Sequence, residues 1–287
     1  MKYNDKMIRY FISISIVIVA FLFINSGIDL MDSGYILNSY QFILSNPETT
    51  SMSMVFTSIT GNLLIKLFDI LNIPIFLGFK IITSITTLIC VYVVYKTLEK
   101  YFNRTLILIG LLIAVIISKG FISIFMYNHI TTLFFVLSVA ALIKGVLYDK
   151  GLFVILSGAI IGFNIFMRIP NVAEIIIILS VVYWGVYKKD FKKTVINFTN
   201  FIFGFIVAII ISLLIINAVF GMEDFINAII KLSTEAQTST DGYSMNDMLR
   251  ANLFLGFQGI IIATINPKIK LVKFITVFLK SFLYTPQ

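Results

Sequence analysis

Long apolar runs separated by short basic turns constrain this chain more than any other feature of its sequence. The runs cover residues 10–24, 75–95, 106–118, 122–141, 152–167, 172–187, 196–220 and 251–265, with a shorter one at 274–283. A helix needs ~20 apolar residues to cross a bilayer, and in lipid it satisfies its own backbone hydrogen bonds. The sequence therefore predicts an all-α, polytopic transmembrane helix bundle of about eight or nine spans. We expect residues 1–287 to form a single membrane domain.

The composition supports the same class of protein. Charged side chains make up 13% of the 287 residues and hydrophobic ones 59%, whereas a soluble domain carries about 25% charged residues. We therefore expect the lipid bilayer as a partner. The net charge of +8 does not indicate nucleic-acid binding, because lysine and arginine occur in small groups between apolar runs. A single cysteine, Cys90, and a single histidine, His129, exclude an internal disulfide and a multi-histidine metal site.

Basic residues indicate which side of the membrane each turn occupies. Alternating spans would bring most basic groups to one side, at residues 2–9, 96–104, 144–150, 188–193 and 268–273. The other side would hold isolated cations, namely Lys66, Lys80, Lys119, Arg168, Lys231 and Arg250. Lysine and arginine concentrate on the cytoplasmic side of membrane proteins. We therefore predict a bacterial-type cytoplasmic membrane protein with a cytoplasmic N-terminus, and with the polar connections 25–72 and 221–250 outside the cytoplasm.

The connection at residues 25–72 is predicted to contain two helices. Residues 35–44 are rich in large apolar side chains and are followed by Asn46-Pro47, which stops a helix. Over residues 54–71 the large apolar side chains fall on one helix face, and the opposite face carries Ser58, Asn62, Lys66 and Asp69. Such an amphipathic pattern is typical of a helix that lies in the membrane interface. A second span with its polar side toward the bundle is the alternative.

Two carboxylates, Asp29 and Asp32, follow the first apolar run directly. On a helix this spacing places both on one face, and in a loop it lets them share a cation. A carboxylate in apolar surroundings has a raised proton affinity and can act as a base. The alternative is that Asp32-Ser33-Gly34 caps the following helix, since aspartate and serine are preferred there. The sequence indicates no particular cofactor, and a divalent cation stays an open possibility.

Arg168 ends an apolar run on the same predicted side as these carboxylates. It could bind a phosphate, or it could pair with Glu174, because a lone carboxylate inside a span is costly. Asn128 and His129 lie near another outer turn and could join Arg168 as donors to a phosphate. For His129 the alternative is a role in packing.

The second polar connection begins with an amphipathic stretch at residues 223–236 and continues through a polar turn at Thr238–Gly242. It could cover a substrate or act as a plain connector. The sequence contains no phosphate-binding P-loop, no dinucleotide-binding glycine motif and no serine-hydrolase elbow. We therefore do not expect nucleotide-driven energy coupling within this chain.

Three features together resemble a known superfamily. They are the basic N-terminus with its first span, the acidic motif Asp29-Leu30-Met31-Asp32-Ser33-Gly34-Tyr35, and a long outer loop with membrane-lying helices. This order resembles the GT-C superfamily of integral-membrane glycosyltransferases, in particular the group around protein O-mannosyltransferases and lipid A aminoarabinose transferases. The Ser58–Leu71 stretch and Arg168-Ile169-Pro170-Asn171 add to the likeness. The resemblance covers residues 1–270 as topology.

The resemblance implies inverting transfer of a sugar from a polyprenyl-phosphate donor to an acceptor outside the cytoplasm. Asp32, or Asp29, would be the base that activates the acceptor hydroxyl. The substrate-binding residues would be Arg168, His129, Asn128, Tyr35 and Asn171, with Arg168 and His129 on the phosphate of the donor. The chain is shorter than is usual in this superfamily, and its acidic motif is Asp-x-x-Asp rather than an adjacent pair. A transporter or flippase of lipid-linked sugars, or a non-catalytic truncated membrane protein, is the alternative.

Overall fold

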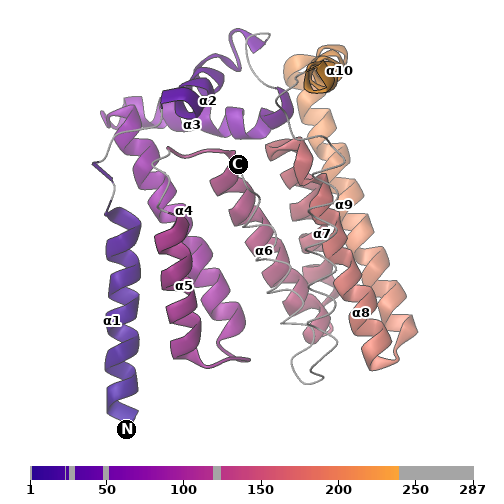
Figure 1. Ribbon diagram of the computed structural model, residues 1–287. Coiled ribbons are helices and arrows are strands. Elements are labelled where there is room, and N and C mark those ends of the chain that lie inside the picture. Colours follow the sequence, from indigo (N-terminus) through magenta and orange to yellow (C-terminus); the bar gives the residue numbers. More distant parts are fainter. Residues whose placement is uncertain (1, 23, 26–29, 48–51, 119–123, 239–287) are drawn as a thin grey trace.

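The computed structural model describes residues 2–22, 24–25, 30–47, 52–118 and 124–238, and this part of the chain is helical without β-strands (Figure 1). The α-helices are α1 (Lys2–Phe21), α2 (Leu30–Phe42), α3 (Val55–Ile70), α4 (Ile75–Leu98), α5 (Arg104–Ser118), α6 (Tyr127–Leu147), α7 (Gly151–Met167), α8 (Leu179–Lys188), α9 (Phe191–Phe220) and α10 (Met222–Thr238). The 3₁₀ helices η2 (Met52–Met54) and η3 (Ile169–Ile178) directly precede α3 and α8. The prediction of an all-α protein is confirmed for these residues.

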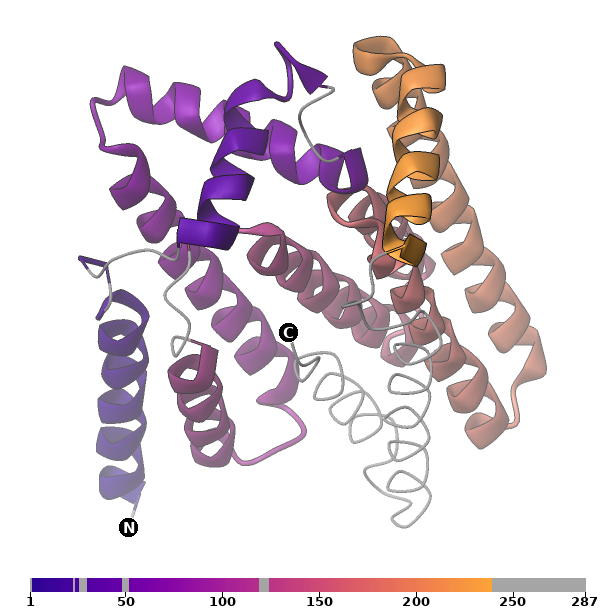
Figure 2. The same cartoon turned by 45° about the horizontal axis from the view of Figure 1, so that its top comes forward.

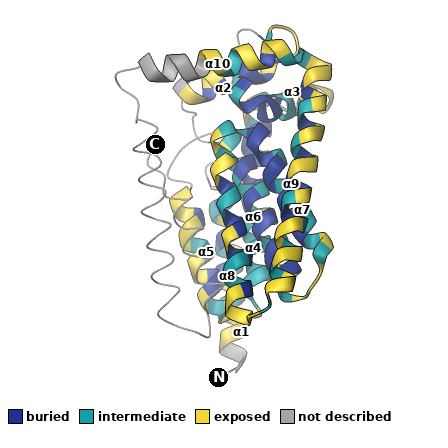
Figure 3. Ribbon diagram, turned by 90° about the vertical axis from the view of Figure 1, so that its right-hand side faces the viewer, coloured by how far each residue is buried: buried dark blue, intermediate teal, exposed yellow. Residues whose placement is uncertain are grey.

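The helices run in two directions. Helices α1 and α4 to α9 stand side by side, whereas α2, α3 and α10 lie across one end of them (Figures 1 and 3). By length and composition, five helices can cross a membrane: Met52–Ile70, Ile75–Leu98, Tyr127–Leu147, Ile169–Lys188 and Phe191–Phe220. The chain therefore has the helices of an integral membrane protein. Helix α3 together with η2 is long and apolar enough for a span, although α3 runs crosswise to the upright helices.

The turns with basic groups lie together at the end of the bundle opposite the crosswise helices. The start of α1 and the α4–α5, α6–α7 and α8–α9 turns all reach this end (Figure 1). The predicted basic group at residues 268–273 lies outside the described residues. Four lysines here also lie over aromatic rings: Lys96 over Tyr95, Lys100 over Tyr148, Lys144 over Phe153 and Lys188 over Trp184. The shared side expected for the described basic groups is confirmed, and its assignment to the cytoplasm stays a prediction.

The polar stripe of α3 is divided by the structure, contrary to the expectation of one polar and one apolar face. Ser58 and Asn62 are buried, because α2 crosses and packs against α3 (Figure 2), while Lys66 and Asp69 are exposed. Asn62 donates its Nδ2 to the carbonyl of Tyr40 at 2.8 Å. Buried polar groups are tolerated where they find such partners. The apolar face is divided as well, with Leu63 and Leu67 exposed and Phe56 and Phe68 buried.

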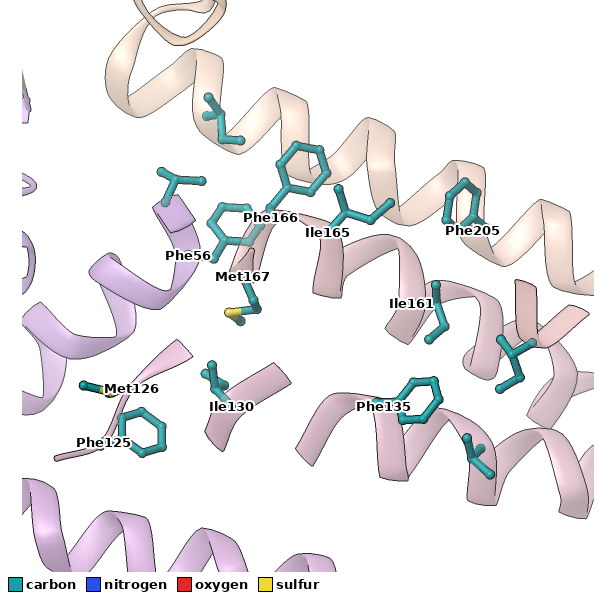
Figure 4. Close-up of a cluster of buried hydrophobic side chains, with 14 of the residues drawn as sticks. Phe56, Phe125, Met126, Ile130, Phe135, Ile161, Ile165, Phe166, Met167 and Phe205 are labelled. Carbon is teal, nitrogen blue, oxygen red and sulfur yellow. The ribbon is translucent and has the colours of Figure 1, made fainter. Parts of the chain in front are cut away.

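One hydrophobic core joins the crosswise layer to the upright helices. Figure 4 shows Phe56 from the start of α3, Met126 from the segment before α6, and Phe166 from the end of α7 within one cluster. The rings of Phe56 and Phe166 lie 5.7 Å apart, centroid to centroid. Residues far apart in the sequence therefore hold the ends of α3, α6 and α7 together.

The closest helix contact in the core joins α7 and α9 through small residues. Gly158 and Gly162 are spaced as a small-xxx-small motif on α7, and Gly204 and Ala208 repeat this spacing on α9. A Cβ added to Gly158 would collide with the carbonyl oxygen of Phe201, and one added to Gly204 would collide with that of Ile155. Small residues let membrane helices bring their backbones into contact.

This contact predicts opposite effects for two Gly→Ala variants. Gly158→Ala should destabilise the protein by about 2 kcal/mol, because the obstructing atom belongs to the backbone of α9 and the helices must separate. Gly110→Ala in α5 is the matched control, since its added Cβ meets open space and alanine favours the helix by up to about 1 kcal/mol. Unfolding of the purified protein in detergent measures both. Equal stability of the two variants would contradict the close contact.

Candidate functional site

The turn between α7 and η3 exists because of its proline. Pro170 cannot continue the hydrogen bonding of α7 and disfavours helical backbone at Ile169. Helix α7 ends at Met167, and Arg168 has an extended backbone with φ −161° and ψ 119°. Pro170 then occupies the first turn of η3, where its fixed φ is favourable and its missing N–H has no consequence.

Asn171 stabilises this turn with two hydrogen bonds. Its Nδ2 donates to the carbonyl of Asn164 at 3.1 Å, and its backbone N–H donates to the carbonyl of Arg168 at 2.9 Å. Carbonyl groups at the end of a helix lack helical partners, and such side-chain donors supply them. Asn171, predicted as a substrate-binding residue, therefore has a structural task, and its side chain is half-buried.

The apolar run at residues 172–187 is helical as predicted, but it is not one regular helix. Its first part belongs to η3, which runs for ten residues before α8 begins. Runs of 3₁₀ helix beyond three or four residues are uncommon. The successive isoleucines 175–178 are β-branched and crowd the turns of an α-helix, which favours this irregular stretch next to the proline turn.

His129 caps the start of α6. Its Nδ1 accepts the backbone N–H of Met126 at 3.1 Å, and its ring stacks on Phe125 with centroids 6.1 Å apart. Glutamate or glutamine holds the same position in a capping box, where it satisfies a free N–H of the first turn. The geometry matches the structural alternative for His129. It also explains why α6 begins at Tyr127 rather than at residue 122 as the sequence predicted.

Arg168 and Asn128 meet at the start of α6. The guanidinium group lies over the Tyr127 ring at 4.5 Å from its centroid, and its Nη1 is 3.5 Å from Asn128 Oδ1. That distance is at the upper limit of a hydrogen bond, so the ring contact is the stronger constraint. Arg168 is half-buried and Asn128 is exposed. The Arg168 guanidinium and the Asn128 amide therefore offer N–H donors to solvent, and the Tyr127 ring holds the guanidinium in place.

The electrostatics of this corner favour an anion. The first turns of α6 and of η3 flank Arg168, and helix N-termini carry partial positive charge. No ion pair between described residues joins Arg168 to a carboxylate. The predicted pairing with Glu174 is wrong, because Glu174 is buried and its Oε2 accepts Nδ2 of Asn164 at 2.8 Å. A cationic side chain beside helix N-termini is an arrangement that binds phosphate or carboxylate.

The acidic motif lies on a neighbouring helix at the same end of the bundle (Figure 1). Asp32 and Tyr35 are exposed on α2, and Asp29 lies outside the described residues. Asp32 sits inside the first turn, where the helix dipole stabilises a carboxylate, so it is not the residue that precedes the helix. No hydrogen bond or ion pair between described residues joins Asp32 to Arg168.

Tyr40 connects α2 to the corner that holds Arg168. Its hydroxyl donates to the carbonyl of Phe125 at 2.9 Å. Burial raises the pKa of the Tyr40 phenol, so the group remains a donor. Asp32 is eight residues from Tyr40, or about 12 Å along the helix. The structure thus brings Arg168 against Asn128 and places Asn171 in the same turn as Arg168. The His129 side chain contacts Met126 and Phe125 instead, and Asp32 and Tyr35 lie on α2.

Sequence reasoning missed Asn164, which is fully buried on α7. It contacts Glu174, the carbonyl of Thr131 and, through its own carbonyl, Asn171. The available signal was an amide in a run of apolar residues, since polar side chains inside a span are costly unless partnered. No family model matches the chain, nor does any curated protein or solved structure.

The capping role of His129 predicts that substitutions at this residue change the stability of the protein rather than its activity. His129→Ala should lower stability by about 1 kcal/mol, because the N–H of Met126 loses its acceptor. His129→Gln should restore most of this loss, since glutamine fits a capping box. Thermal unfolding in detergent measures both variants. A stable His129→Gln protein without activity would instead assign His129 to the chemistry.

Proposed function

We propose that this chain is a GT-C-like membrane glycosyltransferase that moves a sugar from a polyprenyl-phosphate donor to an acceptor outside the cytoplasm. The observation that carries the proposal is Arg168, a half-buried cation beside the first turns of α6 and η3. No described carboxylate forms an ion pair with it. A site with these properties suits a phosphate held at a membrane surface.

The arrangement of helices supports the same proposal. We place α1, α4, α5, α6, α7, η3 with α8, and α9 across the membrane. The runs at residues 251–265 and 274–283, predicted from the sequence as further spans, lie outside the described residues, and with them the total would be nine, within the expected eight or nine. Helices α2, α3 and α10 would lie in the outer interface. The basic end would face the cytoplasm, so that the Arg168 corner opens outside, on the side predicted for the connections 25–72 and 221–250.

In the proposed reaction Asp32 takes the proton of an acceptor hydroxyl. The acceptor oxygen forms a bond to the anomeric carbon as the bond from that carbon to the phosphate oxygen breaks, with inversion. The polyprenyl phosphate leaves with the electron pair, and Arg168 stabilises the charge that develops on it. Asn128 would support Arg168, while grooves between upright helices would hold the isoprenoid tail.

A transporter of lipid-linked sugars is the second candidate. One observation favours it: Asn164 and Glu174 form a buried polar pair inside the bundle, and transporters place polar groups in broken helices within the membrane. The Arg168 corner lies at the end of the bundle, which favours the enzyme.

Loss of the Arg168 charge should weaken donor binding. We expect Arg168→Gln to reduce affinity for undecaprenyl phosphate about ten- to a hundredfold, because a charge-assisted hydrogen bond is lost. Native mass spectrometry of the detergent-solubilised protein measures this affinity. Arg104→Gln, at the opposite end of the bundle, is the matched control and should bind like the wild type. Equal weakening in both variants would refute a specific site at Arg168.

Removal of the proposed base should stop transfer without affecting folding. Asp32→Asn should lower the rate of sugar transfer from a polyprenyl-phosphate donor about a thousandfold, which is within the contribution of a general base. Membrane insertion should not change, since Asp32 is exposed. Unchanged transfer would remove Asp32 from the mechanism. Movement of a lipid-linked sugar across proteoliposomes without a modified acceptor would favour the transporter.

A further inference from the structure

Glu174 is the sole buried carboxylate among the described residues, with 5% of its surface exposed. It lies on η3, within the apolar segment Ile169–Lys188 that is long enough to cross a membrane. No ion pair between described residues includes it. A buried carboxylate without a cation is expensive in apolar surroundings. The groups that contact Glu174 must therefore offset the cost of burying its carboxyl group.

Asn164 faces this carboxylate from α7. Its Nδ2 group donates to Glu174 Oε2 at 2.8 Å and to the carbonyl of Thr131 at 3.3 Å, so both of its hydrogens are used. The side chain cannot be turned round, because Oδ1 would then face two acceptors. In this orientation Oδ1 is fully buried and has no hydrogen-bond partner among the described residues.

Two buried oxygen-bearing side chains thus meet, one a carboxyl group and one with an unpartnered amide oxygen. The hydrogen bond from Asn164 Nδ2 holds the amide group against the carboxyl group, and Oδ1 of the same amide group has no partner. Around them the backbone is irregular, since α7 ends three residues later and η3 follows. Interrupted membrane helices supply carbonyl oxygens to bound ions in this way.

We propose that Asn164 Oδ1 and the Glu174 carboxylate bind a monovalent cation, with sodium as the preferred ion. Amide and carboxylate oxygens are ligands for hard cations, and the single negative charge of Glu174 balances one positive charge. A divalent ion would leave an excess charge in the apolar interior. The site is separate from the Arg168 corner in its chemistry, and it does not depend on the proposed transfer reaction.

Asn62 provides an internal comparison. It is also buried with an unpartnered Oδ1, and its Nδ2 donates to the carbonyls of Tyr40 and Gln41. No carboxylate contacts its side chain within the described residues. A buried amide oxygen without a hydrogen-bond partner therefore occurs at both Asn62 and Asn164, and this feature is not enough to define a site. The feature specific to Asn164 is the adjacent buried carboxyl group of Glu174.

The test compares thermal unfolding of the full chain in detergent at equal ionic strength in sodium chloride and in choline chloride. A sodium concentration a hundredfold above Kd should raise the unfolding temperature by about 5 °C. Glu174→Gln, which keeps an acceptor for Asn164 Nδ2, should abolish the difference between the salts. Asn62→Ala should lower the unfolding temperature in both salts and retain the difference.

Binding of radioactive sodium to the wild type supplies a second measurement that needs no variant. Saturation at about one ion per chain, displaced by unlabelled sodium and not by choline, supports the proposal. Identical unfolding temperatures in both salts, without saturable sodium binding, would overturn it. So would a difference that persists in Glu174→Gln, a difference lost in Asn62→Ala, or stronger stabilisation by calcium than by sodium. Stabilisation by acid alone would assign the carboxylate to a proton and equally reject a sodium site.

Discussion

The backbone contact between α7 and α9 is the constraint on which the other parts of the structure depend. Gly158 and Gly204 bring each helix against a carbonyl oxygen of the other, so the axis of α7 can move little. Helix α7 in turn packs on α6, η2, η3 and α3. Its last turn supplies Asn164, and Arg168 follows directly after its end. The position of both polar clusters therefore derives from glycines a few turns away that carry no functional group.

The upright helices were predictable because apolar length and basic turns define them. Residues 75–95 were expected and α4 covers Ile75–Leu98; residues 152–167 were expected and α7 covers Gly151–Met167. Helix α6 starts later than expected, since its first turn depends on the His129 cap rather than on hydropathy. Helix α2 starts at Leu30, earlier than the expected residue 35, and includes Asp32 in its first turn. The irregular backbone of η3 depends on local turn geometry that apolar periodicity does not record.

The candidate site was predictable in part. Arg168 and Asn128 were expected together and lie within contact of each other. The pairing of Arg168 with Glu174 was a reasonable electrostatic hypothesis, but Glu174 lies two turns into η3 and faces Asn164 inside the bundle. Such a choice between partners depends on how three helices rotate against one another. The sequence contains the residues and their spacing, whereas the rotation follows from packing around Phe56, Phe166 and the glycines of α7.

The lysine–aromatic pairs at the basic end have a mechanical consequence. In each pair an ammonium group, which requires water, is held over an aromatic ring, and in three of the four pairs this ring is a tyrosine or tryptophan, which prefers the boundary of the hydrocarbon layer. The four pairs lie on α4, α6, α7 and α8 or in their turns, at the basic end of the bundle. Sliding the bundle along the membrane normal would bury charge in one direction and expose apolar rings in the other. In a bilayer these pairs would therefore resist a shift of the bundle along the membrane normal.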